Sequence, residues 1–496
     1  MKSRKIFLIL ALNLFSLANL FSYDTAFVRT FGGKFKEVAY DVKQTYDKGF
    51  VIVGSTNSFT SGLTSIYVVK TDSSGIFQWS KTFGGVNVDL GRSIQVDADS
   101  GYSILGYTNS TGYGGYDMRF IKMDASGNVL WQKTYGGNDW DFGYSHAVLP
   151  DGGYVLCGET YSYTNGSSDA YVIRTNKYGD TLWTRHYGGS WNDAANSVIV
   201  DSDSTYVIVG SLALSGSNTN GLFIKLDSAG NTLAFQNYGG SNTDVLNSVC
   251  MTNDGGFAMQ GTSNSFSAGG DNDAYLIKTD NSGNYSLDPV FGSTGADEGT
   301  ALIKIRNGQL VLTGTLTNFG LGATAMTVYR LNATTCGWQD GAAFGGIYEE
   351  SGHAITLTNS GGIVFVGSTS TWGQGQEDMY FVKMYNDSIV ANYTLQVVQY
   401  NDNLLSSIEK HGSNEDGIII SPNPFSTSTL IKIKDDSFLT SKEIKFEVFD
   451  MCGKLIHTKN SANLSFEFNR GDLPPGIYFY SVSCKSKIIN GKIIIN

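Results

Sequence analysis

The feature that most constrains the fold is a short motif, an aromatic residue followed by two glycines, which returns at a nearly fixed distance. The copies begin at Phe31, Phe83, Tyr135, Tyr187, Tyr238, Phe291 and Phe344. Their first residues are separated by 52, 52, 52, 51, 53 and 53 positions, and only the sixth copy is degenerate, with a serine as its third residue. Seven copies at this spacing indicate a repeat fold, and a period of about 40 to 50 residues is typical of four-stranded propeller blades.

Alternation of apolar and polar residues places four strands within each repeat, and the third repeat shows them best. We predict strands at Tyr144 to Leu149, Tyr154 to Tyr161, Asp169 to Thr175 and Asp180 to His186. These strands and their turns fill one period and leave no room for a helix. The 60 glycines and only 6 prolines suit such closely spaced turns. The sequence therefore predicts an all-β fold.

The two ends of the array suggest how the propeller closes. Thr25 to Thr30 resembles a fourth strand without the three before it, whereas the last repeat has three clear strands that end near Met384. We expect the N-terminal strand to complete the last blade, which removes open sheet edges and gives a seven-bladed propeller over residues 23–398. Ile389 to Val398 could be a spare strand, so eight sheets or another closure stay open.

Two columns of charge run through the repeats. An acid stands six positions after each motif start, at Glu37, Asp89, Asp141, Asp193, Asp244, Asp297 and Glu350. A base stands about 39 positions after it, at Lys70, Lys122, Arg174, Lys225, Lys278, Arg330 and Lys383. The acids could form a ring that holds a cation such as calcium, or each could cap a turn or pair with a base in its own or the adjoining blade. We favour the structural role, because a ligand site seldom needs seven equivalent groups.

The turn before the fourth strand reads Asp72-Ser-Ser-Gly75 and leads to Trp79, and the next two repeats are alike. It is similar to the Asp-box of sialidase-like propellers and to the tryptophan-docking motif of quinoprotein-like propellers, although the spacing matches neither. In both families the motif mostly holds blades together, so the resemblance implies no catalytic residue.

Binding is the function that the loops favour. The loops between second and third strands and the turns after the motifs should share one face, and they are rich in Ser, Thr, Asn, Gly and Tyr, as in adaptable binding surfaces. Aromatic residues break the repeat symmetry there, at Trp140, Trp191, Tyr348, Trp372, Tyr113 and Tyr116. Aromatic rings beside carboxylates and amides suit a glycan or a protein ligand. The net charge of −11 argues against nucleic acid.

Catalysis has little support in the sequence. No nucleophile elbow, phosphate-binding loop or dinucleotide fingerprint is present, and the five histidines and five cysteines lack metal-ligand spacing. Asp139, Asp141, Glu349 and Glu350 could supply the carboxylate pair of a glycosidase, but the acid column places carboxylates there in any case. We therefore assign no catalytic residue, no cofactor and no metal site, with calcium left open. A polysaccharide-degrading enzyme and a purely structural surface protein are the alternatives to a binding protein.

The two ends of the chain carry targeting signals. Residues 1–22 combine a basic start with an apolar run, which predicts a secretory signal peptide. The repeat pattern stops near Gln399, and residues 399–416 are a polar linker. Residues 417–496 carry a net charge of +3, with ten basic and seven acidic side chains. Alternating runs predict the short strands of an immunoglobulin-like β-sandwich, at Leu430 to Ile433, Ile444 to Phe449, Leu464 to Phe468, Ile477 to Val482 and Ile488 to Ile495.

This last segment resembles the C-terminal sorting domain of proteins exported by the type IX secretion system of Bacteroidetes. The resemblance rests on Pro422, Asn423, Pro424, Asp450, Gly453, Gly476, Tyr478 and Lys492, and on the motifs around them. It implies recognition by the type IX secretion machinery and passage across the outer membrane. The mature protein would then be released or attached to the outer cell surface through lipopolysaccharide.

Overall fold

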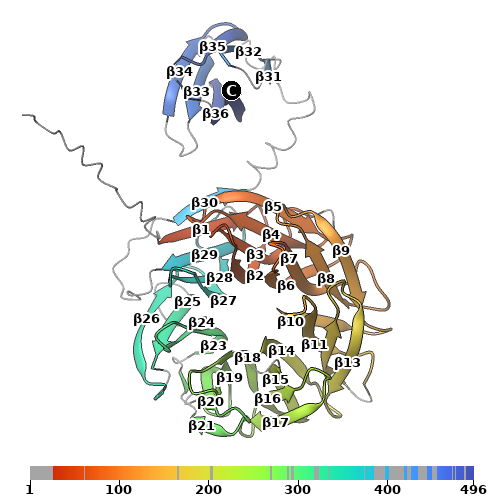
Figure 1. The fold of residues 1–496 in the computed structure, drawn as a ribbon. Coiled ribbons are helices and arrows are strands. Elements are labelled where there is room, and N and C mark those ends of the chain that lie inside the picture. The colour runs from red at the N-terminus through yellow and green to blue at the C-terminus, as the bar shows by residue number, and fades with distance from the viewer. Residues whose placement is uncertain are drawn as a thin grey trace, which may run out of the picture. The chain divides into compact units, whose positions relative to one another are not determined.

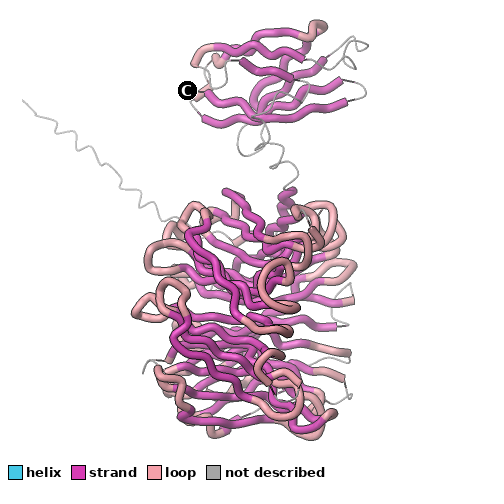
Figure 2. Tube along the Cα trace, turned by 90° about the vertical axis from the view of Figure 1, so that its right-hand side faces the viewer, coloured by secondary structure: helices cyan, strands magenta, loops and turns pink. Residues whose placement is uncertain are grey.

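The computed structural model divides the chain into two units, Met1–Tyr400 and Asn401–Asn496. It describes residues 26–401 except 61, 165–166, 202–204, 268–270, 288–289, 292–294, 318–322, 333, 374 and 385–396. It also describes residues 418–495 except 422–425, 434–443, 450–454, 472, 475 and 485–486. The predicted signal peptide and nearly all of the predicted linker lie outside these residues. The described residues form strands and loops and no helix (Figure 2).

The first unit consists of seven antiparallel sheets arranged around a channel (Figure 1). The strands nearest the channel are β2 (Glu37–Gln44), β6 (Asp89–Val96), β10 (Asp141–Val148), β14 (Ala194–Val200), β18 (Asp244–Met251), β23 (Glu298–Lys304) and β27 (Glu350–Leu357). The second strands are β3 (Phe50–Thr56), β7 (Tyr102–Thr108), β11 (Tyr154–Thr160), β15 (Tyr206–Ser215), β19 (Phe257–Ser263), β24 (Leu310–Thr317) and β28 (Ile363–Thr369). The third strands are β4 (Ser65–Thr71), β8 (Asp117–Met123), β12 (Asp169–Thr175), β16 (Asn218–Leu226), β20 (Asp273–Thr279), β25 (Thr324–Leu331) and β29 (Asp378–Met384).

The outermost strands complete the blades. They are β5 (Phe77–Phe83), β9 (Val129–Tyr135), β13 (Thr181–Tyr187), β17 (Thr232–Tyr238), β21 (Tyr285–Leu287) with β22 (Val290–Phe291), β26 (Trp338–Phe344) and β1 (Phe27–Gly32). The four-stranded blade read from the sequence is therefore confirmed. We number the blades 1 to 7 from the blade that begins with β2.

Closure occurs as the sequence predicts. Strand β1 pairs with β29 in antiparallel register, with Phe27 opposite Lys383 and Phe31 opposite Met379. Most of the predicted spare strand, Ile389 to Val398, lies outside the described residues. Its last two positions belong to strand β30 (Val397–Asn401), which adds to the outside of β1 as a fifth strand of blade 7 and forms no eighth sheet. Joining the first and last strands of the array in one sheet ties the ring shut, and the seven-bladed propeller is confirmed.

Neighbouring blades hold together through their apolar faces and a small set of inter-blade contacts. The ring of Trp79 lies 6.1 Å from that of Tyr102 in the next blade. A Cβ on Gly127, at the turn between the last two strands of that blade, would come within 3.0 Å of the Trp79 ring. The hydroxyl of Tyr135 donates to the carbonyl of Gly179 across the next boundary, at 2.6 Å. These contacts match the blade-holding role that the turn motif implies.

The second unit is a small β-sandwich. One sheet has the order β31 (Ile418–Ser421), β32 (Ser428–Ile433), β35 (Ser465–Asn469), and the other has the order β34 (Leu455–Ser461), β33 (Ile444–Phe449), β36 (Gly476–Cys484), β37 (Lys487–Ile495). The buried faces of the two sheets share a core that includes Phe446, Phe468 and Tyr480. The expected sandwich is confirmed.

Candidate functional site

A β-bulge interrupts the channel strand of every blade. In β10, Gly143 pairs with Gly158 and Ser145 with Cys157, so Tyr144 is the extra residue. The extra residues of the seven strands are Tyr40, Arg92, Tyr144, Asn196, Asn247, Thr300 and His353. A bulge re-aims a side chain, and all seven of these residues line the channel, whose volume is about 920 Å³. We call them the channel ring.

A glycine of the second strand makes room for each bulge. In blade 3, a Cβ on Gly158 would come within 1.8 Å of the carbonyl oxygen of Phe142, which no side chain allows. The equivalent glycines are Gly54, Gly106, Gly158, Gly210, Gly261, Gly314 and Gly367, and each stands 23 residues after its motif start. The sequence thus contained a signal for the channel ring, and our sequence analysis missed it.

Three of the seven side chains in the channel ring are bonded to the next blade. The Asn196 amide donates to the carbonyl of Leu246 at 3.0 Å, and the Asn247 amide donates to that of Gly299 at 2.8 Å. The Thr300 hydroxyl donates to the carbonyl of Gly352 in the next blade, at 2.8 Å. These three side chains therefore act mainly as links between blades.

The other four members of the channel ring are three rings and one cation. The Arg92 guanidinium carbon lies 4.4 Å from the centre of the Tyr40 ring and 5.7 Å from that of Tyr144. Tyr144 donates its hydroxyl hydrogen to Glu159 at 2.8 Å, and the His353 ring lies 5.3 Å from that of Tyr40. Burial lowers the pKa of His353 to about 3, so this imidazole is neutral at physiological pH and adds no charge to the channel.

An aromatic cluster adjoins the channel ring at Tyr144, where blades 2 and 3 meet. It consists of Tyr107, Tyr116, Trp140, Phe142, Tyr144 and Tyr161. The Trp140 ring lies 6.1 Å from that of Tyr116 and 6.3 Å from that of Phe142. Phe142 in turn stacks on Tyr144 at 6.4 Å, with an interplanar angle of 8°. We call this group the Trp140 cluster.

The backbone of the surrounding loops fixes the Trp140 cluster. The amide of Asp141 donates to the carbonyl of Tyr116 at 2.7 Å, and the amide of Tyr161 donates to that of Trp140 at 2.8 Å. The turn after the motif in blade 3 is therefore bonded to the loops between second and third strands of blades 2 and 3. Trp140 nevertheless keeps 49% of its surface exposed, so one large ring is presented to solvent on a fixed support.

The structure brings together only two of the six aromatic residues that the sequence singled out, Trp140 and Tyr116. Tyr113 is highly exposed on the same loop as Tyr116, and Trp191 lies against Gly216 in blade 4. Two more lie on blade 7: Tyr348 lines a separate hollow of about 430 Å³, and Trp372 stacks on Tyr380 at 5.4 Å. The sequence analysis did not single out the other four cluster residues, of which it read Tyr144 and Tyr161 as strand residues.

The acid column does not line the channel. All seven carboxylates are buried, and none belongs to the channel lining. In blade 3, Asp141 accepts hydrogen bonds from the Gly137 amide at 2.8 Å and from the Ser162 hydroxyl at 2.6 Å, together with one from Thr160. Glu37, Asp89, Asp193, Asp244 and Glu350 accept from the equivalent glycine amides. These acids hold the turn after the motif against its neighbours.

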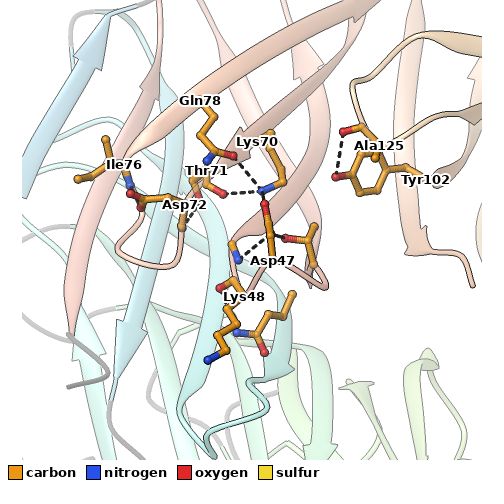
Figure 3. Close-up of polar contacts among 12 residues, drawn as sticks. Asp47, Lys48, Lys70, Thr71, Asp72, Ile76, Gln78, Tyr102 and Ala125 are labelled. Atoms are coloured by element: carbon orange, nitrogen blue, oxygen red, sulfur yellow. Dashed lines mark hydrogen bonds and ion pairs between the residues drawn. The ribbon is translucent and has the colours of Figure 1, made fainter. Parts of the chain in front are cut away.

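The base column has other partners than the acid column. The Lys70 amino group bonds to Asp47 at 2.8 Å, to the carbonyl of Thr71 at 2.9 Å and to Gln78 at 3.0 Å (Figure 3). Asp47 belongs to the hairpin turn between the first two strands, and in blade 2 the equivalent turn holds Lys122 through Asp97 and Asp99. The expected pairing between the two columns is therefore wrong for these blades, because the bases lie at the opposite ends of the strands.

The described residues contain no group of side chains that is arranged as a metal site. No three His, Cys, Asp or Glu side chains within them are grouped so as to hold a metal ion. Asp141 and Glu350 are two of the four carboxylates that could have supplied a glycosidase pair, and both accept structural hydrogen bonds. Burial, followed by the nearby charge of Asp141, raises the pKa of Asp117 to about 6.

The described part of the chain also has no helix long and apolar enough to cross a membrane.

Comparison with known families identifies the C-terminal unit. Residues 420–496 match the model described as the secretion system C-terminal sorting domain. This unit is a type IX secretion sorting domain. The domain marks proteins that type IX secretion exports, so the protein interacts with that machinery and is secreted or attached to the outer cell surface.

The sorting motif is only partly described. Gly476 and Lys492 lie on the paired strands β36 and β37, and Tyr478 is buried and donates its hydroxyl hydrogen to the carbonyl of Pro474 at 2.8 Å. The other predicted motif residues lie outside the described part of the chain, at Pro422, Asn423, Pro424, Asp450 and Gly453.

Other likenesses are distant. The regulatory protein FlaEY of Caulobacter vibrioides is 26% identical over 134 residues, which cover 24% of this chain and 14% of that protein. PorZ of Porphyromonas gingivalis, a surface component of its type IX secretion system, is 10% identical with a TM-score of 0.38, over 91% of this chain and 69% of PorZ. The Pan2 WD40 domain of Neurospora crassa is 11% identical with a TM-score of 0.42, over 71% of this chain and 90% of that domain. Scores this low carry no argument about function.

Proposed function

We propose that this exported propeller is a glycan-binding protein and that the Trp140 cluster is its binding site. The observation that carries the proposal is the half-exposed Trp140 ring, held by neighbouring rings and by backbone hydrogen bonds at the mouth of the channel. Sugar rings present flat C–H faces that pack on such rings, and hydroxyl groups at their edges need polar partners nearby.

Polar groups stand beside the Trp140 cluster. Glu159 lines the channel and accepts hydrogen bonds from Tyr144, at 2.8 Å, and from Tyr161, and a carboxylate has about four lone-pair sites, so it can accept further hydroxyl groups. The exposed carboxylate of Asp139 lies next to Trp140 in sequence, and its oxygen accepts the Trp140 backbone amide at 3.0 Å. A rigid aromatic surface with acceptors at its edge suits the flat C–H face and the hydroxyl groups of a sugar.

A glycan array tests the proposal with two matched variants. Trp140→Ala removes the central ring of the cluster, whereas Trp191→Ala removes a ring of similar exposure on blade 4, outside the cluster. We expect the purified protein to bind at least one class of glycan, Trp140→Ala to lose that binding, and Trp191→Ala to keep it. Both variants should retain the wild-type melting temperature. Absence of glycan binding, or equal binding by Trp140→Ala and wild type, would overturn the proposal.

A further inference from the structure

Arg92 is the one member of the channel ring whose side chain carries a fixed positive charge. The structure gives its guanidinium two ring contacts, to Tyr40 and Tyr144, and no hydrogen bond or ion pair to any residue that it describes. Its side chain is only partly exposed and lines the channel cavity. A guanidinium carries five N–H donors in a planar fork, so Arg92 offers a set of donors that its described neighbours do not use.

The other cation of the cavity behaves differently. Lys43 also lines the channel, but its amino group pairs with Asp41 at 2.6 Å. The Tyr40, Tyr107 and Tyr144 rings and the neutral His353 around Arg92 supply no counter-charge. The carboxylate of Glu159 lines the same cavity and accepts from the Tyr144 hydroxyl, and it forms no ion pair with Arg92 among the described residues. Two flanking tyrosine rings hold the guanidinium in place while its N–H edge remains free. This arrangement is prepared for a planar anion, since carboxylates match the fork with two parallel hydrogen bonds.

Arg92 is also connected to the Trp140 cluster. From the guanidinium, successive steps of 5.7 Å to Tyr144, 6.4 Å to Phe142 and 6.3 Å to Trp140 lead towards the mouth of the channel. A short oligosaccharide can span these steps, with one sugar against the exposed ring and a charged sugar deeper in the channel. We propose that the ligand is an acidic glycan whose sugar carboxylate binds Arg92 while a neighbouring sugar packs on Trp140. This inference rests on the proposed function and adds the chemical class of the ligand.

The test compares acidic glycans with their neutral counterparts. The purified protein is applied to an array of uronic-acid and sialic-acid glycans printed beside the same glycans with their carboxyl groups reduced to alcohols, and the strongest pair is titrated calorimetrically. We expect the acidic form to bind about tenfold to a hundredfold more tightly, as a hydrogen-bonded charge pair provides. Arg92→Gln should abolish this preference, so that the acidic and the reduced glycan bind equally. Arg92→Lys should keep part of the preference, because it retains the charge and loses the planar fork.

Lys43→Gln is the matched control, because it removes a channel cation that already has a partner; its preference for the acidic form should stay within about threefold of wild type. Equal binding of acidic and reduced glycans, or an unchanged preference in Arg92→Gln, would overturn the role of Arg92 while Trp140-dependent binding of reduced glycans still supported the proposed function. Absence of all glycan binding would overturn both. Arg92-dependent binding of an aspartate-rich peptide, without glycan binding, would overturn the assignment to a sugar.

Discussion

Replacing Asp141 by alanine tests the structural role of the acid column. The carboxylate is fully buried, and it accepts the Gly137 amide, the Ser162 hydroxyl and the Thr160 hydroxyl. The alanine variant leaves these donors without that acceptor, and each unsatisfied buried donor costs about 1 to 3 kcal/mol. Because the hydroxyls can rotate towards other acceptors, we expect a loss of about 3 to 5 kcal/mol in the free energy of unfolding.

The loss is measured by urea denaturation followed by tryptophan fluorescence, with refolding as a check of reversibility. Asp139→Ala is the control, since this neighbouring carboxylate is exposed, and it should change stability by no more than about 0.5 kcal/mol. A loss below about 1 kcal/mol for Asp141→Ala would refute the reasoning from buried donors. Calcium that stabilises the wild type but not Asp141→Ala would instead show that the acid column holds a cation.

Three further predictions address the carboxyl next to Asp141, the closure of the ring and the route of export. The raised pKa of Asp117 means that the folded state binds its proton more tightly, so stability falls as pH rises from about 4 to 6. Asp117→Asn should therefore raise the free energy of unfolding by about 1 to 3 kcal/mol at pH 7 and change it little at pH 4; equal effects at both pH values in urea denaturation would contradict this. Phe27→Ala should cost about 3 to 5 kcal/mol, because the buried ring lies 4.9 Å from that of Phe381 in the closing blade; a cost no larger than that of Tyr113→Ala, which removes a highly exposed ring, would contradict it. Deletion of residues 417–496 should leave the protein in the periplasm by cell fractionation, and normal delivery to the surface would refute export through the sorting domain.

The sequence was sufficient to predict the propeller because each blade repeats local signals. The motif copies predicted the number of blades, and the alternation of residues predicted the order of the strands within each blade. The lone strand before Phe31 indicated the closure with β29. In the second unit, strands at Leu430 to Ile433 and at Ile444 to Phe449 were predicted within two residues of β32 and β33. Strands β31 and β34 were missed, and the exposed pattern of β34 gave little apolar alternation to recognise.

The site was harder to predict, because it depends on contacts between blades. The acid column allows either a cation ring or turn capping, and only the burial of residues such as Asp141 separates the two. The channel ring depends on bulges, which shift the alternation of a strand by one residue and so hide Arg92 and Tyr144 among ordinary strand positions. The glycine 23 residues after each motif start was visible in the sequence, but its meaning required the carbonyl that it faces.

Only part of the Trp140 cluster was recognised from the sequence, because the cluster also depends on contacts between blades. Trp140 and Tyr116 stand in loops, where a large aromatic residue draws attention as a departure from the repeat. Tyr107 and Phe142 lie in strands, where aromatic residues are common, so nothing local marked them as neighbours of Trp140. Only the packing of blade 2 against blade 3 brings the rings together.

Hydrogen exchange measured with and without a bound glycan tests the central claim most directly. The ligand is the acidic glycan that binds best on the array, added to the purified protein at saturation. We predict slower exchange in the loop at residues 108–117 and in the turn at residues 135–141, which carry Tyr116 and Trp140, and no change in the equivalent turn at residues 187–193 of blade 4. Protection in blade 4, or no protection at the Trp140 cluster, would contradict a glycan site at the mouth of the channel.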